Sequence, residues 1–466
     1  MTNKSSKNNK NNSTDNTIAL AKEGLGTWRV SRKYVDIEKP HQFDMTAEKQ
    51  EVFDILEYSN NNVFLTGKAG TGKSNFLQYF RTHTRKKVVV LAFTGVAAIN
   101  VQGQTIHSFF KFNPQTTLDS IKTRWGEEAK MYKRIDTIII DEISMVRADL
   151  LDFVDRFMRL NGNDSSKPFG GVQIFAIGDL YQLPPIVREN EKEYFATEYN
   201  SQYFFDAHVY QLADFVKKEL TEMYRQNKNE QSQFIKTLDN LRTCTFDDAD
   251  IDLINKRYDS IYEKPSNELV ISLVPTNQIA DYINTKELEK LSAEPVTYTG
   301  IIQDDFNTKD LPTAQNLILR EGAQVMLLQN DPRQRWVNGD IVKIIKTESE
   351  YVRVLFDDGS FDDIYSAKWE SIKFVLDEKT DKIKPEVAGT FTQLPLKLAW
   401  AVTIHKAQGK TFEKVHIEFG RGTFAPGQAY VALSRCRSLE GMTLTSPLRK
   451  HYVFTDKKIQ QFMSSE

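Results

Sequence analysis

The chain has 466 residues, 40% of them hydrophobic and 27% charged, which is too long for one compact core and suits three or four modules. Its 61 basic and 63 acidic residues give a formal net charge of −2, so any case for a nucleic-acid partner must come from motifs. Two widely separated cysteines argue against a disulfide framework or zinc site, and the lack of a long apolar run or signal-peptide core predicts a cytoplasmic protein.

The N-terminal residues 1–26 are expected to form a disordered polar tail. Residues 1–16 are almost wholly Lys, Asn, Ser, Thr and Asp, a composition that buries too little apolar surface to offset the entropy of ordering. A weak tether to DNA is the alternative interpretation. Beyond the tail, Thr46 is predicted to cap a helix in which apolar residues recur at helical spacing.

Short apolar runs that alternate with helical patterns predict an α/β domain over residues 27–206. The expected strands are Val63–Leu65, Val88–Phe93, Ile135–Ile140 and Gln173–Ile177. Strands that alternate with helices indicate a doubly wound parallel sheet.

A second region of this kind is expected over 207–316 and 395–466. Its apolar runs are widely separated, at Leu269–Val274, Val415–Phe419 and Gly441–Thr445. The insert between them, 317–394, is β-rich and is punctuated by the turn pairs Asn338-Gly339 and Asp358-Gly359. We expect a small antiparallel barrel there, with strands at Gln324–Leu328, Asp340–Ile345, Tyr351–Phe356 and Phe361–Tyr365.

A glycine-rich loop between a strand and a helix predicts a phosphate site. It matches GxxxxGK[ST] and consists of Gly67, Lys68, Ala69, Gly70, Thr71, Gly72, Lys73 and Ser74. Backbone N–H groups and the helix N-terminus can cradle phosphates here. Lys73 is predicted to hold the β- and γ-phosphates, and Ser74 to ligate Mg²⁺.

Two carboxylates follow the next apolar strand. Asp141 is predicted to hold the metal and Glu142 to polarise the attacking water. Acidic pairs at the ends of buried strands are common, so this pair gains its meaning from the P-loop. The later block Gly178–Pro185 carries an amide, Gln182, that could sense the γ-phosphate, although a strand that simply ends at prolines is the simpler interpretation.

These blocks resemble the Pif-one (petite integration frequency) family of DNA helicases, relatives of RecD-like enzymes within helicase superfamily one. The matching segments span about Phe43 to Thr445 and follow the family's order. Besides the P-loop, Asp141–Met145 and the Gln182 block, they are Gln50, Ala92–Ala98, Gly103–Phe109, Lys167–Gly171, Met223–Gln226, Ala401–Gly409 and Tyr430–Arg437.

The resemblance implies two RecA-like P-loop motor domains with ATP in the cleft between them. Gln50 would read adenine, and Gly409 would border the nucleotide. Arg225 and Arg435 would reach from the second motor domain to the γ-phosphate, where an arginine stabilises charge that develops in the transition state. A lone arginine is more often part of a surface salt bridge.

The resemblance also implies contacts to DNA. Thr94, His107, His405 and Lys406 would line a groove for single-stranded DNA. Phe109, Phe110 and Phe112 are candidate base-stacking residues, although phenylalanines at this density are more often core. A small wedge module is expected near residues 110–131. The insert would be SH3-like, and whether it faces DNA or only spaces the strands stays open.

We therefore expect an ATP-dependent, Mg²⁺-requiring DNA helicase that moves 5′ to 3′ on single-stranded DNA and unwinds forked or structured DNA. A monomer that could self-associate on DNA is expected, nucleoid-associated in a bacterium or phage and nuclear or mitochondrial in a eukaryote. The alternative is a P-loop NTPase that switches protein partners without translocating. A third hypothesis is a DNA-binding module without catalysis, which the presence of every catalytic residue disfavours.

Overall fold

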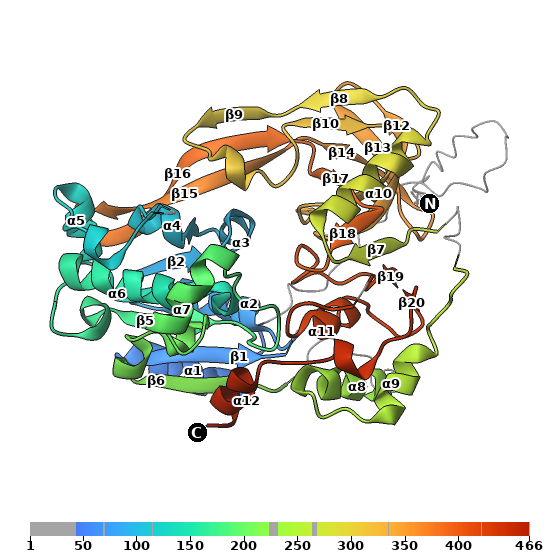
Figure 1. Cartoon of the computed structure of the whole chain (residues 1–466). Helices are drawn as coiled ribbons and strands as arrows, with labels where there is room; N and C mark the ends of the chain where they lie inside the picture. Colours follow the sequence, from blue (N-terminus) through green and yellow to red (C-terminus); the bar gives the residue numbers. More distant parts are fainter. Residues whose placement is uncertain are drawn as a thin grey trace, which may run out of the picture.

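The computed structural model describes residues 43–68, 70–113, 115–222, 232–262, 268–333, 335–420 and 422–465. Two α/β domains lie side by side, and a β-rich part extends above both of them (Figure 1). Within the described ranges, no helix is long and apolar enough to cross a membrane. The expected tail at 1–26 lies outside the described residues.

The first α/β domain contains a six-stranded sheet in the order β3-β2-β4-β5-β1-β6. All its strand pairs are parallel, as the alternating pattern predicts. The strands are β1 (Asn62–Gly67), β2 (Val88–Ala92), β3 (Gln104–Thr105), β4 (Thr137–Asp141), β5 (Gln173–Ile177) and β6 (Phe215–Leu220). Runs of valine and isoleucine form β2 and β4 because both faces of a parallel sheet are buried by helices.

The helices of this domain are α1 (Ala47–Tyr58), α2 (Lys73–His83), α3 (Gly95–Asn100), α4 (Ile106–Phe110), α5 (Glu127–Tyr132), α6 (Ala148–Asn161) and α7 (Lys192–Glu198). Thr46 caps α1 as predicted, since its hydroxyl accepts a hydrogen bond from the backbone N–H of Lys49. In the segment of the expected wedge around 110–131, Ile121 and Met131 pack into the core of the first α/β domain.

The second α/β domain has a four-stranded parallel sheet in the order β18-β7-β19-β20. Its strands are β7 (Ile271–Val274), β18 (Ala401–Thr403), β19 (Val415–Ile417) and β20 (Met442–Leu444). Its helices are α8 (Ser232–Thr243), α9 (Asp248–Asn255), α10 (Asn277–Glu289) and α11 (Gln428–Leu433). The three strands expected here are confirmed, and β18 was not anticipated.

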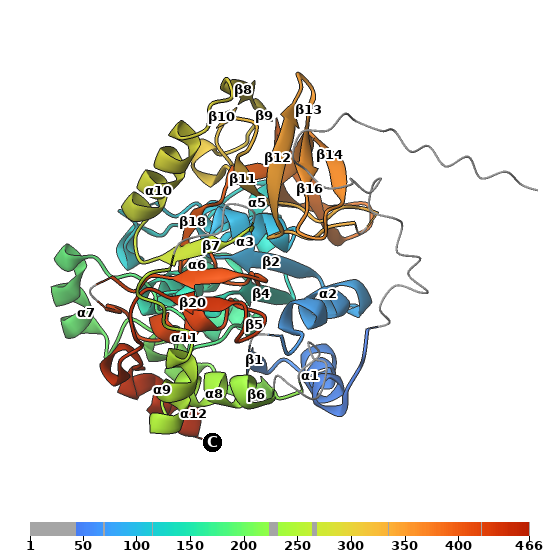
Figure 2. The same ribbon diagram turned by 90° about the vertical axis from the view of Figure 1, so that its right-hand side faces the viewer.

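The β-rich part contains the four strands expected for the insert. Its five-stranded antiparallel sheet has the order β14-β13-β12-β11-β17, with β11 (Gln324–Leu327), β12 (Ile341–Thr347), β13 (Tyr351–Leu355), β14 (Phe361–Tyr365) and β17 (Leu396–Leu398). Beside it lie β8 (Val296–Thr299), β9 (Ile301–Asp304), β10 (Asn316–Leu319), β15 (Ala367–Asp377) and β16 (Lys382–Gln393). Figure 2 shows β12, β13 and β14 at the top of the molecule, above α2.

The structure departs from the boundaries expected from sequence in three places. Strand β6 pairs with β1, so the first α/β domain continues past residue 206. Helix α12 (Lys457–Ser464) returns to that domain, where Phe462 stacks on Phe205 at 4.2 Å between ring centroids. The β-rich part extends beyond 317–394, because β8 and β17 belong to it. In each place the deciding contact is with residues distant in sequence.

The hairpin β15–β16 reaches from the β-rich part to the first α/β domain (Figure 1). Phe374 is buried in the core of that domain, 6.2 Å from the ring of Phe109. Near the hairpin's tip, Glu378 pairs with Lys130 at 2.6 Å and Asp381 with Lys87 at 2.5 Å. The β-rich part is therefore attached to both α/β domains.

Candidate nucleotide and DNA sites

The P-loop joins the end of β1 to the start of α2. Gly70 and Gly72 have φ of +90° and +88°, and Gly72 is the N-cap of α2. A Cβ on Gly67 would stand 2.7 Å from the hydroxyl of Thr71, so this turn requires glycine. Ser74 is exposed in the first turn of α2, while Ala69 lies outside the described residues.

Lys73 folds back over this loop. Its Nζ donates to the carbonyl oxygens of Gly67 at 2.6 Å and Lys68 at 3.0 Å. Burial lowers the pKa of Lys73, and the carboxylates of Asp179 and Glu142 oppose that shift. The ammonium group thus lies within the loop whose N–H groups would meet phosphate oxygens.

Asp141 and Glu142 stand at the carboxyl end of β4. Glu142 has a left-handed backbone with φ of +52°, a conformation that is strained for a residue other than glycine and that recurs at functional sites. Burial raises the pKa of Asp141. Burial, followed by the charge of Asp141, raises the pKa of Glu142 to about 7. A carboxylate with such a pKa can exchange a proton near neutral pH.

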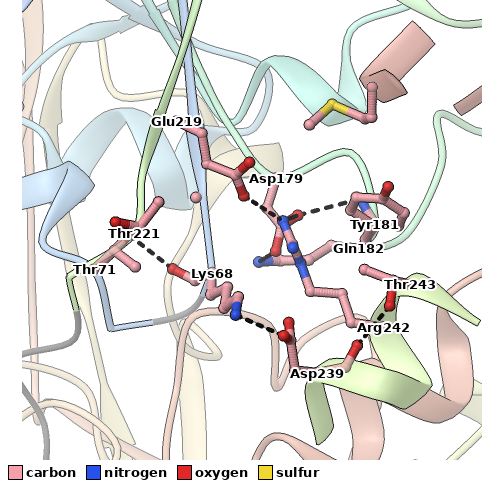
Figure 3. A network of polar contacts seen from close by, with 12 residues as sticks. Lys68, Thr71, Asp179, Tyr181, Gln182, Glu219, Thr221, Asp239, Arg242 and Thr243 are labelled. Atoms are coloured by element: carbon pink, nitrogen blue, oxygen red, sulfur yellow. Dashed lines mark hydrogen bonds and ion pairs between the residues drawn. The ribbon is translucent and has the colours of Figure 1, made fainter. Parts of the chain in front are cut away.

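Gln182 belongs to a polar network at the carboxyl end of β5 (Figure 3). Its Nε2 donates to Asp179 Oδ2 at 3.3 Å, and Asp179 Oδ1 accepts from Arg242 Nη2 at 3.0 Å. Arg242 comes from α8 of the second α/β domain, so the network crosses the cleft. Lys68 crosses it too, through an ion pair with Asp239 at 2.7 Å.

Arg435 follows α11 and is 2% exposed, so the interpretation of it as part of a surface salt bridge is wrong. Its guanidinium donates to the carbonyl oxygens of Val431 at 2.9 Å and Lys410 at 3.0 Å and to Ser434 Oγ at 2.8 Å. Its positive charge opposes the rise in the pKa of Glu142.

The remaining nucleotide candidates differ in their placement. Gln50 is exposed on α1, where its amide donates to Asp54 at 2.8 Å. Gly409 lines a cavity of about 430 Å³ that extends from Lys68 of the P-loop to α8 and the chain around Arg437. Arg225 lies outside the described residues.

Buried polar atoms without a partner surround this cleft. Among the described residues they include Gln182 Oε1, Arg242 Nε and Gln408 Nε2. Buried polar groups are normally hydrogen-bonded, so each such atom calls for an explanation. Together with the P-loop, they fit a polar, anionic ligand such as a nucleoside triphosphate with its water.

The DNA candidates divide between the two α/β domains. The hydroxyl of Thr94 accepts from the backbone N–H of Ala97 at 3.2 Å and so caps α3. His107 is partly buried, and burial lowers its pKa. In the second α/β domain, Lys406 is exposed and His405 lines a largely apolar cavity of about 550 Å³ between the domains.

The phenylalanines near the expected wedge belong to the core. Phe109 and Phe110 are 3% and 0% exposed, and Phe112 stacks on Phe110 at 5.3 Å. Core packing, the more common role for phenylalanine, is therefore confirmed for Phe109 and Phe110.

Sequence reasoning did not single out Asp179, Arg242 or Lys410. Asp179 lies in the Gly178–Pro185 segment, but no feature of the sequence indicated that its carboxylate would be buried. Arg242 is an ordinary arginine near the end of a helix, and no local pattern could reveal its partner 63 residues away.

Comparisons with known proteins agree with this arrangement. The model of the PIF1-like helicase family matches residues 44–252. A relative from Bdellovibrio bacteriovorus, ATP-dependent DNA helicase Pif1, is 29% identical over 432 residues, which cover 91% of this chain and 92% of the relative.

Two solved structures extend the comparison. The crystal structure of Bacteroides sp Pif1 in complex with ADP-AlF4 is 36% identical, with a TM-score of 0.84 over 91% of this chain and 97% of that chain. Bacteroides Pif1 bound to ssDNA has the same identity, 36%, and a TM-score of 0.64 over 90% and 96% of the two chains. On the family model and these similarities, the chain belongs to the PIF1-like helicase family.

Proposed function

We propose that this chain, an ATP-dependent DNA helicase of the PIF1-like family, hydrolyses ATP in the cleft between its α/β domains and thereby moves 5′ to 3′ along single-stranded DNA. The observation that carries the proposal is the face-to-face arrangement across that cleft. Lys73, Glu142 and Gln182 stand on one side, and the buried Arg242 and Arg435 come from the other. The 5′-to-3′ polarity rests on the family resemblance.

The residues of the cleft divide the chemistry among them. The P-loop N–H groups and Lys73 bind the β- and γ-phosphates. Glu142 accepts a proton from the attacking water, which its pKa of about 7 permits. Gln182 orients that water, and Arg435 stabilises the charge that develops on the γ-phosphoryl group.

Ser74 and Asp141 would hold Mg²⁺, which supplies charge neutralisation between the β- and γ-phosphates when bound. One hydroxyl and one carboxylate suit this ion, because Mg²⁺ bound to a nucleotide takes most of its ligands from phosphates and water.

Movement follows because the DNA candidates lie on separate domains. Thr94 and His107 belong to the first α/β domain, and His405 and Lys406 belong to the second. A cleft that closes on ATP and opens after hydrolysis would change the distance between these two groups. Each ATP would then advance the chain along one strand.

The β-rich part and the expected wedge would act at the fork. The wedge region carries Trp125, whose side chain is 84% exposed and could meet the first base pair of a duplex. We further propose that the β-rich part is SH3-like and that the protein works as a monomer.

The decisive test combines ATP turnover with unwinding polarity. Single-stranded DNA should raise ATP hydrolysis steeply, and a duplex with a 5′ tail should unwind while one with only a 3′ tail should not. Lys73→Ala should abolish hydrolysis yet keep affinity for single-stranded DNA. ATP turnover that ignores DNA would favour the protein-switch alternative, and unwinding from the 3′ tail alone would overturn the polarity.

A further inference from the structure

Arg242 is anchored in one α/β domain and engaged by the other. Its helix, α8, packs in the core of the second domain through Phe234 and Leu241. Its guanidinium pairs with Asp179 at 3.0 Å, with side chains 3% and 0% exposed. The same group lies 4.5 Å from the ring centroid of Tyr181 and 3.7 Å from Glu219. Figure 3 shows Arg242 pointing into this first-domain pocket.

Burial makes this ion pair sensitive to the relative position of the domains. Opening the cleft would break this bond and admit water to both charges, so the pair forms only while the two domains are in contact. A second ion pair across the cleft, Lys68–Asp239, has side chains 31% and 35% exposed, and exposed pairs contribute little. Arg242 and Asp179 are therefore the ion pair that responds when the cleft opens.

Asp179 links the position of Arg242 to that of Gln182. Its Oδ2 accepts from Gln182 Nε2, which leaves Gln182 Oε1 buried without a partner among the described residues. That oxygen is a hydrogen-bond acceptor suited to a water molecule. Leu183, the next residue, is buried in the core of the second domain, so the loop is held from both sides.

We propose that Arg242 is a positioning residue for ATP hydrolysis, which fixes Gln182 through Asp179 only when the two α/β domains are closed. The inference rests on the proposed assignment of Gln182 to the γ-phosphate and its water. It makes turnover depend on domain arrangement. Any change in that arrangement on binding single-stranded DNA is thereby transmitted to the hydrolytic water.

The test compares Arg242→Gln and Arg242→Lys with the control Lys236→Gln, an exposed position on the same helix. The measurements are kcat and KM for ATP with and without single-stranded DNA, and Tm. Arg242→Gln should lower DNA-stimulated kcat roughly tenfold and basal kcat less, with KM changed under about threefold. Arg242→Lys keeps the charge but loses the planar guanidinium, so its DNA-stimulated kcat should lie between those of Arg242→Gln and the wild type. Lys236→Gln should match the wild type.

Equal losses of basal and stimulated turnover would indicate a merely structural role and overturn the inference. If Arg242→Gln does not fold, Arg242→Lys decides, and normal stimulation by DNA in that variant overturns the inference as well. The variant Gln182→Ala tests the role of Gln182 separately from the role of Arg242. If Gln182→Ala leaves kcat unchanged, the proposed assignment of Gln182 fails. If Gln182→Ala lowers kcat while the Arg242 variants behave like the wild type, only the inference about Arg242 is overturned.

Discussion

Gly427, the residue before α11, lies directly against the backbone of Gln182 in the other α/β domain. A Cβ built on Gly427 would stand 2.8 Å from the carbonyl oxygen of Gln182 and still closer to that of Tyr181. Gly427 also has a left-handed φ of +71°. The helix that leads to Arg435 therefore touches the loop that carries Gln182, and any side chain at Gly427 would force them apart.

Gly427→Ala should lower DNA-stimulated kcat by roughly tenfold, which corresponds to about 1.4 kcal/mol in the barrier. The methyl group would hold the cleft open between Arg435 and the catalytic residues. The matched control is Gly359→Ala, since Gly359 has a φ of +79° and open space around it. Both variants should lose about 1 kcal/mol of stability from backbone strain, and a loss of kcat in the control would contradict this explanation.

Arg435→Ala should lower kcat by about 10³-fold, on the precedent of arginines that stabilise a transferring phosphoryl group. ATP should still bind through the P-loop, so KM should change far less than kcat. A non-hydrolysable ATP analogue should no longer alter the affinity for single-stranded DNA, because closure of the cleft needs the contact between Arg435 and the γ-phosphate. Fluorescence anisotropy with labelled DNA measures that coupling, and near-normal kcat with intact coupling would remove Arg435 from the mechanism.

Lys410→Met should stabilise the protein at pH 7 and lose that advantage towards pH 10. Burial, followed by the charge of Lys397, lowers the pKa of Lys410 to about 8. The unfolded chain therefore binds more protons between pH 8 and the usual lysine pKa, so wild-type stability gains as pH rises through that window. Lys410→Met lacks this gain, so its extra stability over the wild type should shrink by about 2 kcal/mol between pH 7 and pH 10.

Urea unfolding at pH 7 and pH 10 gives the comparison for Lys410. The variant Lys256→Met, at an exposed position, corrects for the effect of alkaline pH on the rest of the chain. An advantage of Lys410→Met that is equal at both pH values would contradict the prediction.

Shortening the hairpin arm should impair unwinding more than ATP hydrolysis. A turn in place of residues 372–387 leaves the pairing of β16 with β9 at 389–392 intact but removes the contact of Phe374 with the first α/β domain. The β-rich part would lose this contact, while Ile99 of α3 would still pack against Phe306, Trp369 and Phe391. A helicase assay on forked DNA, run beside DNA-stimulated ATPase, measures both activities.

The double variant Glu378→Gln with Asp381→Asn is the control for that arm. It removes only ion pairs whose carboxylates are 58% and 49% exposed, and exposed pairs contribute little to stability. Equal losses of unwinding and ATP turnover in the shortened variant would point to a purely structural arm.

Much of the nucleotide site could be read from the sequence because its geometry is local. A strand, a glycine turn and a helix that begins at Lys73 place N–H groups and ammonium together within eight residues. The position of Asp141 and Glu142 could be predicted too, because the carboxyl ends of neighbouring parallel strands share one edge of the sheet. The alternation of strands and helices predicted both α/β domains for the same local reason.

Tertiary structure alone decided what each side chain meets across the chain. Strand β6, with its polar face, joins the first sheet only because β1 is its neighbour. Arg242 meets Asp179 because α8 packs at the domain interface. Local patterns such as spacing and capping depend on nearby residues, whereas a buried ion pair depends on where two separately folded elements come to lie.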